Sequence, residues 1–215
     1  MKSSTRKTLL LTVCALVFIS NVGHAAIVST ETKLNLVQSA FRSVGYTMSN
    51  EFLARWRAKT GGTRTLQIGE LNTTQVQLAL SEQRGLVIAG MQRDLAQGIR
   101  RPGTTYTMPL LQRSMARGYA LNDWYFAVGG CVISTSYRIS VSGLSSNRVV
   151  TCTIPSWNSF ISDDYTFGAS DAYGVVFSST ELLNYEKDGK AKRFSVASVG
   201  FSSKASIASF TVQLR

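Results

Sequence analysis

The chain has 215 residues, with 23 basic against 12 acidic side chains and a single histidine, His24. Hydrophobic residues make up 44% of the chain and charged residues 16%, a composition that indicates a folded protein and argues against intrinsic disorder. A chain of this length can bury one substantial hydrophobic core or two smaller ones.

Residues 1–25 have the pattern of a secretory signal peptide. Three basic residues precede an apolar run from Leu9 to Ile19, and the small residues Gly23 and Ala25 predict cleavage after Ala25. The alternative is an uncleaved membrane anchor, but a spanning helix needs about twenty apolar residues and this run is shorter. No second apolar run of spanning length follows, so we expect a secreted or periplasmic protein without a transmembrane segment.

Cleavage at this position changes the chemistry available to the protein. It removes His24 and Cys14 and leaves 20 basic and 12 acidic residues, a net charge of +8. A chain without histidine cannot form a Ser-His-Asp or Cys-His catalytic site or a zinc site with histidine ligands. The remaining Cys131 and Cys152 predict one disulfide in an oxidising compartment; the alternative, a reactive thiol, would need a nearby base.

The region 26–122 is expected to be helical. Leu34, Val37 and Phe41 fall on one face of a first helix, and Asn50 is expected to cap a second helix. The longest candidate runs from 72 to about 101, with a capping box expected at Thr74. Leu111 and Met115, spaced by four, favour one more helix over 108–120.

From residue 123 the pattern changes to strands. Residues 137–142 alternate apolar and polar side chains, which is typical of a half-buried strand. Further strands are expected over 125–134, 148–154, 157–161 after Pro155, 194–201 and 207–214, with a helical turn at 179–185. The sequence therefore predicts an α+β protein, with an N-terminal helical layer and then a mainly antiparallel β-rich region over 123–215. The two regions could form one domain or two subdomains.

The positive charge is concentrated in the helical region. Residues 26–122 carry a net charge of +7, and residues 123–215 carry +1. The candidate binding residues are Arg55, Arg57, Arg100 and Arg101, which suit an anionic lipid, a lipopolysaccharide or an envelope protein. Nucleic acid would satisfy the same electrostatics, but no nucleic-acid motif is present and export disfavours it. The alternative is a solvated basic face that only maintains solubility.

Two local clusters could carry chemistry. Trp124 and Tyr125, in a run of three aromatic residues, could form a stacking platform for sugars or a partner, or pack in the core of a first strand. Asp163, Asp164 and Asp171 lie close to Tyr165 in the sequence. These side chains could bind a divalent cation through oxygen ligands or divide acid and base roles, or they could form an Asp-rich turn.

The segment Asp163-x-Tyr165-x-Phe167-x-Ala169-Ser170 resembles the signature in the activity domain of colicin M, a bacteriocin that cleaves the lipid II precursor of peptidoglycan. The resemblance extends over residues 108–215. It implies a hydrolase of the phosphodiesterase type that uses a divalent metal such as Mg²⁺. In such a hydrolase Asp163 and Tyr165 would be essential. Asp164 or Asp171 would replace a carboxylate that the family has and this chain lacks.

The sequence departs from that family at three polar positions. The family has a second Asp directly after the Tyr and a closing His-Arg pair, where this chain has Thr166, Ala172 and Tyr173. The departures imply the loss of most of that activity, because such chemistry needs carboxylates for the metal and a base for the water.

We therefore expect an exported, basic, disulfide-containing protein of bacterial type that acts by binding, without a cofactor. The target would be an anionic component of the cell envelope or a protein partner. The alternative hypothesis is a divergent, metal-dependent, envelope-targeting toxin related to colicin M.

Overall fold

A computed structural model of the chain describes residues 28–115, 123–128, 130–165, 177, 180–202 and 208–214. The expected signal peptide at residues 1–25 and the candidate residue Asp171 lie outside these ranges. The described part contains both helices and a sheet, so the predicted α+β class is confirmed.

The chain divides into two compact units that interleave along the sequence. Unit 1 comprises residues 1–64, 117–129 and 164–196, and unit 2 comprises residues 65–116, 130–163 and 197–215. Neither unit coincides with the expected regions 26–122 and 123–215, because each unit takes segments from both. The two units are described separately.

Among the described residues, four helices belong to unit 1. They are α2 (Thr30–Val44), α3 (Thr47–Arg57), α5 (Asp123–Ala127) and α6 (Glu181–Lys187). Helix α2 begins after Ser29, whose side chain accepts a hydrogen bond from the Thr32 amide, and it ends at Gly45, which has a φ of 77°. The left-handed conformation at this position strains any residue with a Cβ, so glycine is the residue that ends a helix there without strain.

The start of α3 differs from the prediction. The helix begins at Thr47, so Asn50 lies inside it and is not its cap. The carboxylate of Asp123 accepts hydrogen bonds from the amides of Met48 and Ser49 at 2.9 and 2.7 Å. Those amides have no partner within the helix, so a side chain about seventy residues away caps α3. Local sequence carries no sign of such a cap.

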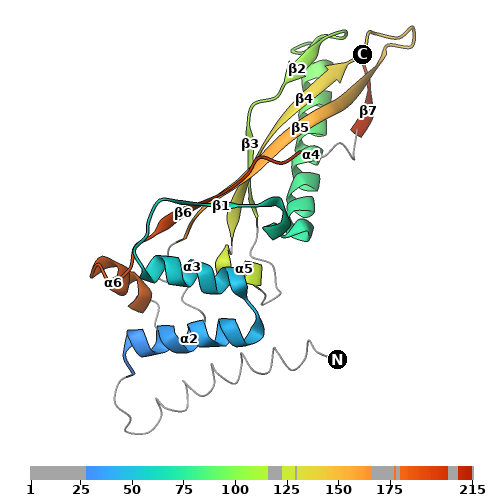
Figure 1. The fold of residues 1–215 in the computed structure, drawn as a ribbon. Coiled ribbons are helices and arrows are strands. Elements are labelled where there is room, and N and C mark those ends of the chain that lie inside the picture. The colour runs from blue at the N-terminus through green and yellow to red at the C-terminus, as the bar shows by residue number, and fades with distance from the viewer. Residues whose placement is uncertain are drawn as a thin grey trace. The chain divides into compact units, whose positions relative to one another are not determined.

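Unit 2 combines one long helix with most of the strands (Figure 1). Its elements are α4 (Thr73–Ala96), the short 3₁₀ helix η1 (Ile68–Glu70), β2 (Thr105–Thr107), β3 (Leu111–Met115), β4 (Cys131–Val141) and β7 (Ala208–Gln213). Strands β1 (Thr63–Leu66), β5 (Val149–Tyr165) and β6 (Phe194–Ser198) contain residues of both units. Helix α4 is capped by Asn72, which accepts from the Gln75 amide, and not by the expected box at Thr74.

Strand β4 is the centre of the sheet in unit 2. It pairs antiparallel with β5 on one side and with β2 and β3 on the other, and β7 pairs antiparallel with β5. The register between β4 and β5 shifts between Arg138 and Ser140. Pro155 lies in β5 at this irregularity, where a missing amide donor is tolerated. Strand β5 is therefore continuous, and the separate strand expected over 157–161 is part of it.

Two predicted elements have the other secondary structure. Residues 111–115 form strand β3 and not a helix, and residues 123–127 form helix α5, so β4 starts only at Cys131. The first error has a geometric cause, because residues spaced by four share a face in a strand as well as in a helix. Leu111 and Met115 therefore fit both structures equally well.

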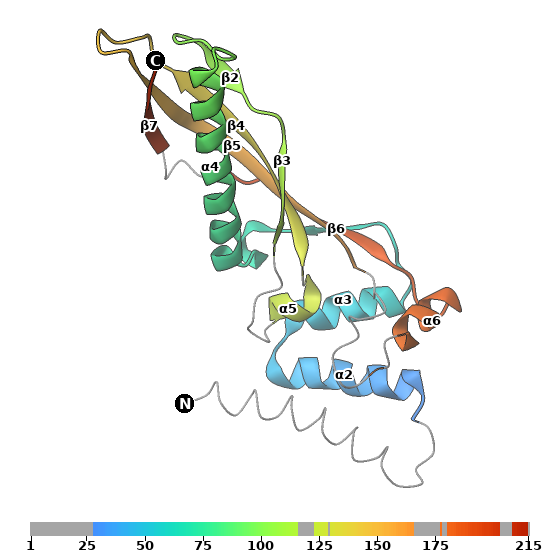
Figure 2. The ribbon, with the colours of Figure 1, turned by 180° about the vertical axis from the view of Figure 1, so that it is seen from behind.

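Helix α4 packs against one face of the sheet (Figure 2). Val87, Met91 and Leu95 form a core with side chains of β4, β5 and β7, including Tyr137 and Ile139. Residues on the opposite side of α4, including Leu78 and Leu86, are exposed. The helix therefore carries apolar side chains on its exposed side as well as on its buried side.

Candidate functional site

The Asp-rich segment lies at the end of strand β5. Asp163 and Asp164 are consecutive residues of an extended strand, so their side chains point to opposite faces. Asp164 is exposed and accepts a hydrogen bond from Ser195 Oγ at 2.8 Å. Asp163 is half-buried, and its charge raises the pKa of Cys131 in addition to the effect of burial. The strand therefore does not bring these two carboxylates together.

Tyr165 is a core residue of unit 1. Its ring stacks on Phe194 with a centroid distance of 5.0 Å and meets Phe52 edge-on at 5.5 Å. Only 6% of the residue is exposed. Within the described residues, no three His, Cys, Asp or Glu side chains lie close enough together to hold a metal ion. Asp171, the third carboxylate of the candidate set, is outside those residues.

The structure contradicts the expected disulfide. Cys131 and Cys152 are both free thiols, and both are buried. Cys131 is the first residue of β4, whereas Cys152 lies opposite Val141, the last of its 11 residues. A strand rises about 3.3 Å per residue, so about 30 Å separates the two cysteines. A disulfide requires Cα atoms within about 7 Å.

Two of the four candidate arginines are engaged inside unit 1. Arg55 donates a hydrogen bond to the carbonyl of Gly61 at 2.8 Å, and its guanidinium lies over the ring of Phe194. Arg57 donates to Gln38 at 2.6 Å and pairs with Glu31. These contacts hold helix and loop segments together, and they leave little of either guanidinium for an outside partner.

The aromatic run also packs within unit 1. Trp124 is 5% exposed, and Tyr125 is half-buried with its ring edge-on to Phe126 at 5.1 Å. Phe126 in turn lies 5.4 Å from Phe41. Core packing, one of the two expected alternatives, is what the structure has, although in a helix and not in a strand.

The described residues of unit 1 line a hollow with a volume of about 620 Å³. Lys33 Nζ forms an ion pair with Glu181 at 2.9 Å, and Tyr185 donates a hydrogen bond to Glu31. Burial, together with Glu31, raises the pKa of Tyr185 to about 12. The charges of the hollow thus neutralise one another, and its residues are Val28, Ser29, Thr30, Glu31, Lys33, Glu181, Tyr185 and Lys190.

The other two candidate arginines lie at one end of unit 2. This end consists of residues 93–106, from the last turn of α4 into β2, and residues 142–148, the β4–β5 turn; we call it the arginine end. A backbone hydrogen bond of 2.8 Å from the Gly103 amide to the Ser142 carbonyl joins its two segments. A second, also 2.8 Å, from the Val141 amide to the Thr104 carbonyl joins the first segment to the end of β4. Its charged residues are Arg93, Asp94, Arg100, Arg101 and Arg148.

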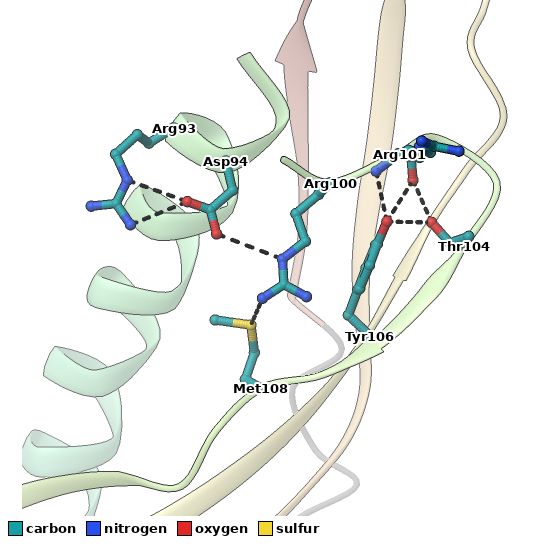
Figure 3. Close-up of polar contacts among 7 residues, drawn as sticks. All are labelled: Arg93, Asp94, Arg100, Arg101, Thr104, Tyr106 and Met108. Carbon is teal, nitrogen blue, oxygen red and sulfur yellow. Dashed lines mark hydrogen bonds and ion pairs between the residues drawn. The ribbon is translucent and has the colours of Figure 1, made fainter. Parts of the chain in front are cut away.

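Arg100 is held firmly at the centre of this end (Figure 3). Its guanidinium carbon lies 4.5 Å from the ring centroid of Tyr106, and its Nε is 3.6 Å from Asp94. Arg93 also pairs with Asp94, yet its side chain is 67% exposed. Arg101 is exposed, and its side chain points away from the cluster in Figure 3. One carboxylate therefore faces several guanidinium groups, and the end has a net positive charge.

Hydrogen bonds fix the loop that presents Arg101. The Tyr106 hydroxyl accepts from the Arg101 amide at 2.6 Å and from Thr104 Oγ1 at 2.7 Å. These hydrogen bonds, that of Thr104 first, and the nearby arginines lower the pKa of Tyr106 below its ordinary value. Donors that face the hydroxyl favour its charged form, which is the physical cause of the lowered pKa.

Large apolar side chains are exposed at the same end. Ile99 is 65% exposed and Leu144 is 51% exposed, one in each of the two hydrogen-bonded segments. Neither side chain belongs to the core of α4 and the sheet. Sequence analysis found Arg100 and Arg101 but missed both apolar residues, because an isolated Ile or Leu in a loop resembles any core residue. Only the exposed fraction shows that they face outward.

Searches of protein-family models, curated proteins and solved structures found no match for this chain. No helix in the described part of the chain has the length and hydropathy needed to span a bilayer.

Proposed function

We propose that this protein is exported and binds an anionic lipid surface of the cell envelope, without catalysis, through the arginine end of unit 2. The observation that carries the proposal is the exposure of Ile99 and Leu144 beside Arg93 and Arg101. Such a combination suits a peripheral membrane contact, in which apolar tips enter the interface and cations contact anionic headgroups.

The energies are of the right size for reversible binding. Each basic residue near an anionic leaflet contributes about 1 kcal/mol, and full burial of an Ile or Leu side chain contributes about 1.5–3 kcal/mol. Asp94 offsets part of the attraction, since it pairs with Arg93 and Arg100. The sum corresponds to weak attachment that salt can reverse in part, because only the electrostatic share is screened.

The fixed geometry of the loops also supports the proposal. The stack of Arg100 on Tyr106 and the hydrogen bonds of Thr104 hold the loop in one conformation. A pre-ordered loop loses less conformational entropy on binding than a flexible one does. The expected export comes from the signal-like segment 1–25, and an envelope lipid is the anionic surface that an exported basic protein meets first.

Co-sedimentation with lipid vesicles tests the proposal. We expect the protein to sediment with vesicles of phosphatidylcholine plus phosphatidylglycerol and not with phosphatidylcholine alone. The bound fraction should fall as salt rises to about 0.5 M, where the screening length is only a few ångströms. Arg93→Gln with Arg101→Gln should weaken binding about tenfold or more, since two charges are worth about 2 kcal/mol.

A matched pair of variants isolates the apolar contribution. Ile99→Ser with Leu144→Ser should weaken binding and leave its salt dependence unchanged. The control is Ile68→Ser with Leu78→Ser, because Ile68 and Leu78 are similarly exposed, at 61% and 55%, elsewhere in unit 2. Equal loss in both double variants, or equal binding to both vesicle compositions, would contradict the proposal.

A further inference from the structure

Helix α4 has one face that the sheet does not cover. The sheet lies on one side of the helix (Figures 1 and 2), where Val87 and Met91 pack into the core. Residues spaced by three or four along a helix share a face, and on the opposite side such a series is exposed. We call this series the outer face of α4; its members are Leu78, Glu82, Gly85, Ala89, Arg93 and Ala96. At about 1.5 Å per residue, it is about 27 Å long.

The glycine in the middle of the outer face has no explanation within the described part of the chain. A glycine inside a helix is destabilising, and it is expected where a positive φ or a close contact requires it. Gly85 does not have a positive φ, and a Cβ placed on it would meet no described atom within 4 Å. Neither the backbone nor the packing of unit 2 therefore calls for glycine here. It does allow another molecule to approach the helix backbone closely.

The outer face is complementary to itself when its direction is reversed. Glu82 and Arg93 are about three helical turns apart on the same flank, and they lie equally far from the midpoint between residues 87 and 88. In an antiparallel pair of α4 helices centred there, Glu82 of each copy faces Arg93 of the other.

The sizes of the side chains favour nearly the same register. In that pair, Gly85 of one copy lies opposite Ala89 of the other, which brings the two backbones close together. Leu78, which is 55% exposed, lies opposite Ala96, so a large side chain meets a small one. Charge and size are independent properties of these residues, and both select an antiparallel pair centred on residues 87–88.

We infer that the outer face of α4 binds the same face of a second copy of this chain, antiparallel and around a two-fold axis. Two-fold dimers are the commonest symmetric oligomers, and each requires a surface that is complementary to itself. Glycine and alanine at the centre let the two helix axes approach to about 8 Å, the lower end of the range for packed helices. The contact buries Leu78 of both copies and forms the Glu82–Arg93 pair twice.

Contacts within the chain leave both charges available. Glu82 pairs with Arg113 at 2.7 Å, and the two side chains are 44% and 49% exposed. Arg93 pairs with Asp94 at 3.1 Å, and its side chain is 67% exposed. Exposed ion pairs contribute little to stability, so neither charge is committed to its own chain.

Other occupants match the outer face less well. An anionic lipid surface would be repelled by Glu82, and a nucleic acid needs several phosphate contacts where this face offers Arg93. The inference does not rest on the proposed lipid binding. An antiparallel pair places the two arginine ends at opposite ends of the dimer, so a membrane meets one arginine end with or without dimerisation. Substitution of Leu78 therefore leaves vesicle binding unaffected.

Analytical ultracentrifugation of the purified chain tests the inference. We expect a reversible equilibrium between one and two copies, and the dissociation constant should rise with salt because part of the attraction is between charges. A chain that stays monomeric up to about 1 mM, the range of the weakest specific contacts, would overturn the inference and leave a different protein as the occupant of the face.

A matched pair of glycine variants separates dimerisation from folding. Gly85→Gln fills the centre of the outer face and should weaken dimerisation at least about tenfold. The control is Gly90→Gln in the same helix, because Gly90 lies off the outer face and a Cβ there also meets no described atom within 4 Å. Glutamine favours a helix more than glycine does, so the melting temperature of both variants should stay the same or rise. Equal dimerisation of the two variants would contradict the inference.

Reversal of the two charges tests the antiparallel register. Glu82→Arg alone and Arg93→Glu alone should each weaken dimerisation several-fold, because symmetry turns two attractive pairs into repulsive ones. The double variant restores both pairs and should dimerise as the unmodified chain does. The two residues are about 16 Å apart along one helix, so they cannot rescue each other within a single copy. A dimer that none of the three variants weakens would form through another surface, and the inference would be wrong.

Discussion

Cys131 and Cys152 lie at opposite ends of the antiparallel pair formed by β4 and β5, one opposite Met115 and the other opposite Val141. The thiol of Cys131 is 3.7 Å from the sulfur of Met115. Each cysteine is a buried packing residue in this arrangement, and the hydrophobic core, not a covalent link, stabilises unit 2.

Both thiols should therefore be free and slow to react. Burial, with the charge of Asp163, raises the pKa of Cys131 to about 12, and burial also raises the pKa of Cys152. Iodoacetamide should label neither residue in the folded protein and both in denaturant without reductant, because the thiolate is the reactive form. Peptide mass spectrometry reads each site, and a linked Cys131–Cys152 peptide would contradict the expectation.

Gln83 should be essential for the stability of unit 2. It is fully buried in α4, donates to the carbonyls of Leu111 and Ile133 at 3.2 Å, and accepts from Tyr137. Gln83→Leu leaves these buried groups without that partner and should cost about 2–3 kcal/mol of unfolding free energy. Urea denaturation measures the change. Gln92→Leu, at an exposed position of the same helix, should change stability by less than about 0.5 kcal/mol.

Asp123→Ala should destabilise unit 1. It removes the acceptor for the Met48 and Ser49 amides and for the hydroxyl of Ser49, which is fully buried. The loss of a helix cap costs about 1–2 kcal/mol. Thermal unfolding measures the effect, and Asp123→Asn should retain part of the stability because its amide oxygen still accepts. Asp188→Ala is the control, since the exposed Asp188 pairs with the exposed Lys190 among the described residues. An equal effect of both alanine variants would argue against the cap.

Glu31 should make unit 1 less stable in acid. The hydrogen bond from Tyr185, and then Arg57, lower the pKa of Glu31 below its ordinary 4.5. A depressed folded-state pKa contributes stability above the unfolded value of 4.5, and that contribution is lost as pH falls through the folded-state pKa.

The variant Tyr185→Phe checks this pH dependence. It removes the largest cause of the lowered pKa, so unfolding free energy should fall less steeply between about pH 6 and about pH 3 than in the unmodified chain. Glu31→Gln should flatten the same slope further. The slope of unfolding free energy against pH separates this effect from a loss of stability that is the same at every pH. An unchanged slope in both variants would show that Glu31 does not contribute to the pH dependence.

Prediction from sequence succeeded where one local signal decides the structure. Helix α4 was found nearly in place from its hydrophobic pattern. Residues 137–141 were correctly assigned to a strand, although they and residues 131–134 belong to one strand, β4, and not to two. The prediction failed at residues 111–115, where spacing by four fits helix and strand alike, and at 123–127, where aromatic side chains suggested a strand. In both segments tertiary packing overrides weak local preference.

The candidate site was found only in part. Arg100 and Arg101 were identified from charge, and they do lie at an exposed end of unit 2. Arg55 and Arg57 have the same charge and similar spacing, yet both are engaged inside unit 1. Charge in a sequence shows which residues can attract an anion, and only the fold shows which of them face solvent.

The sequence by itself determined the α+β class, the position of the long helix and the basic character of the chain. These properties follow from composition and from local periodicity, which every segment carries in its own residues. The tertiary structure alone decided that the cysteines stay apart and that Asp123 caps a distant helix. Each depends on strand register or on long-range packing, which bring together residues far apart along the chain.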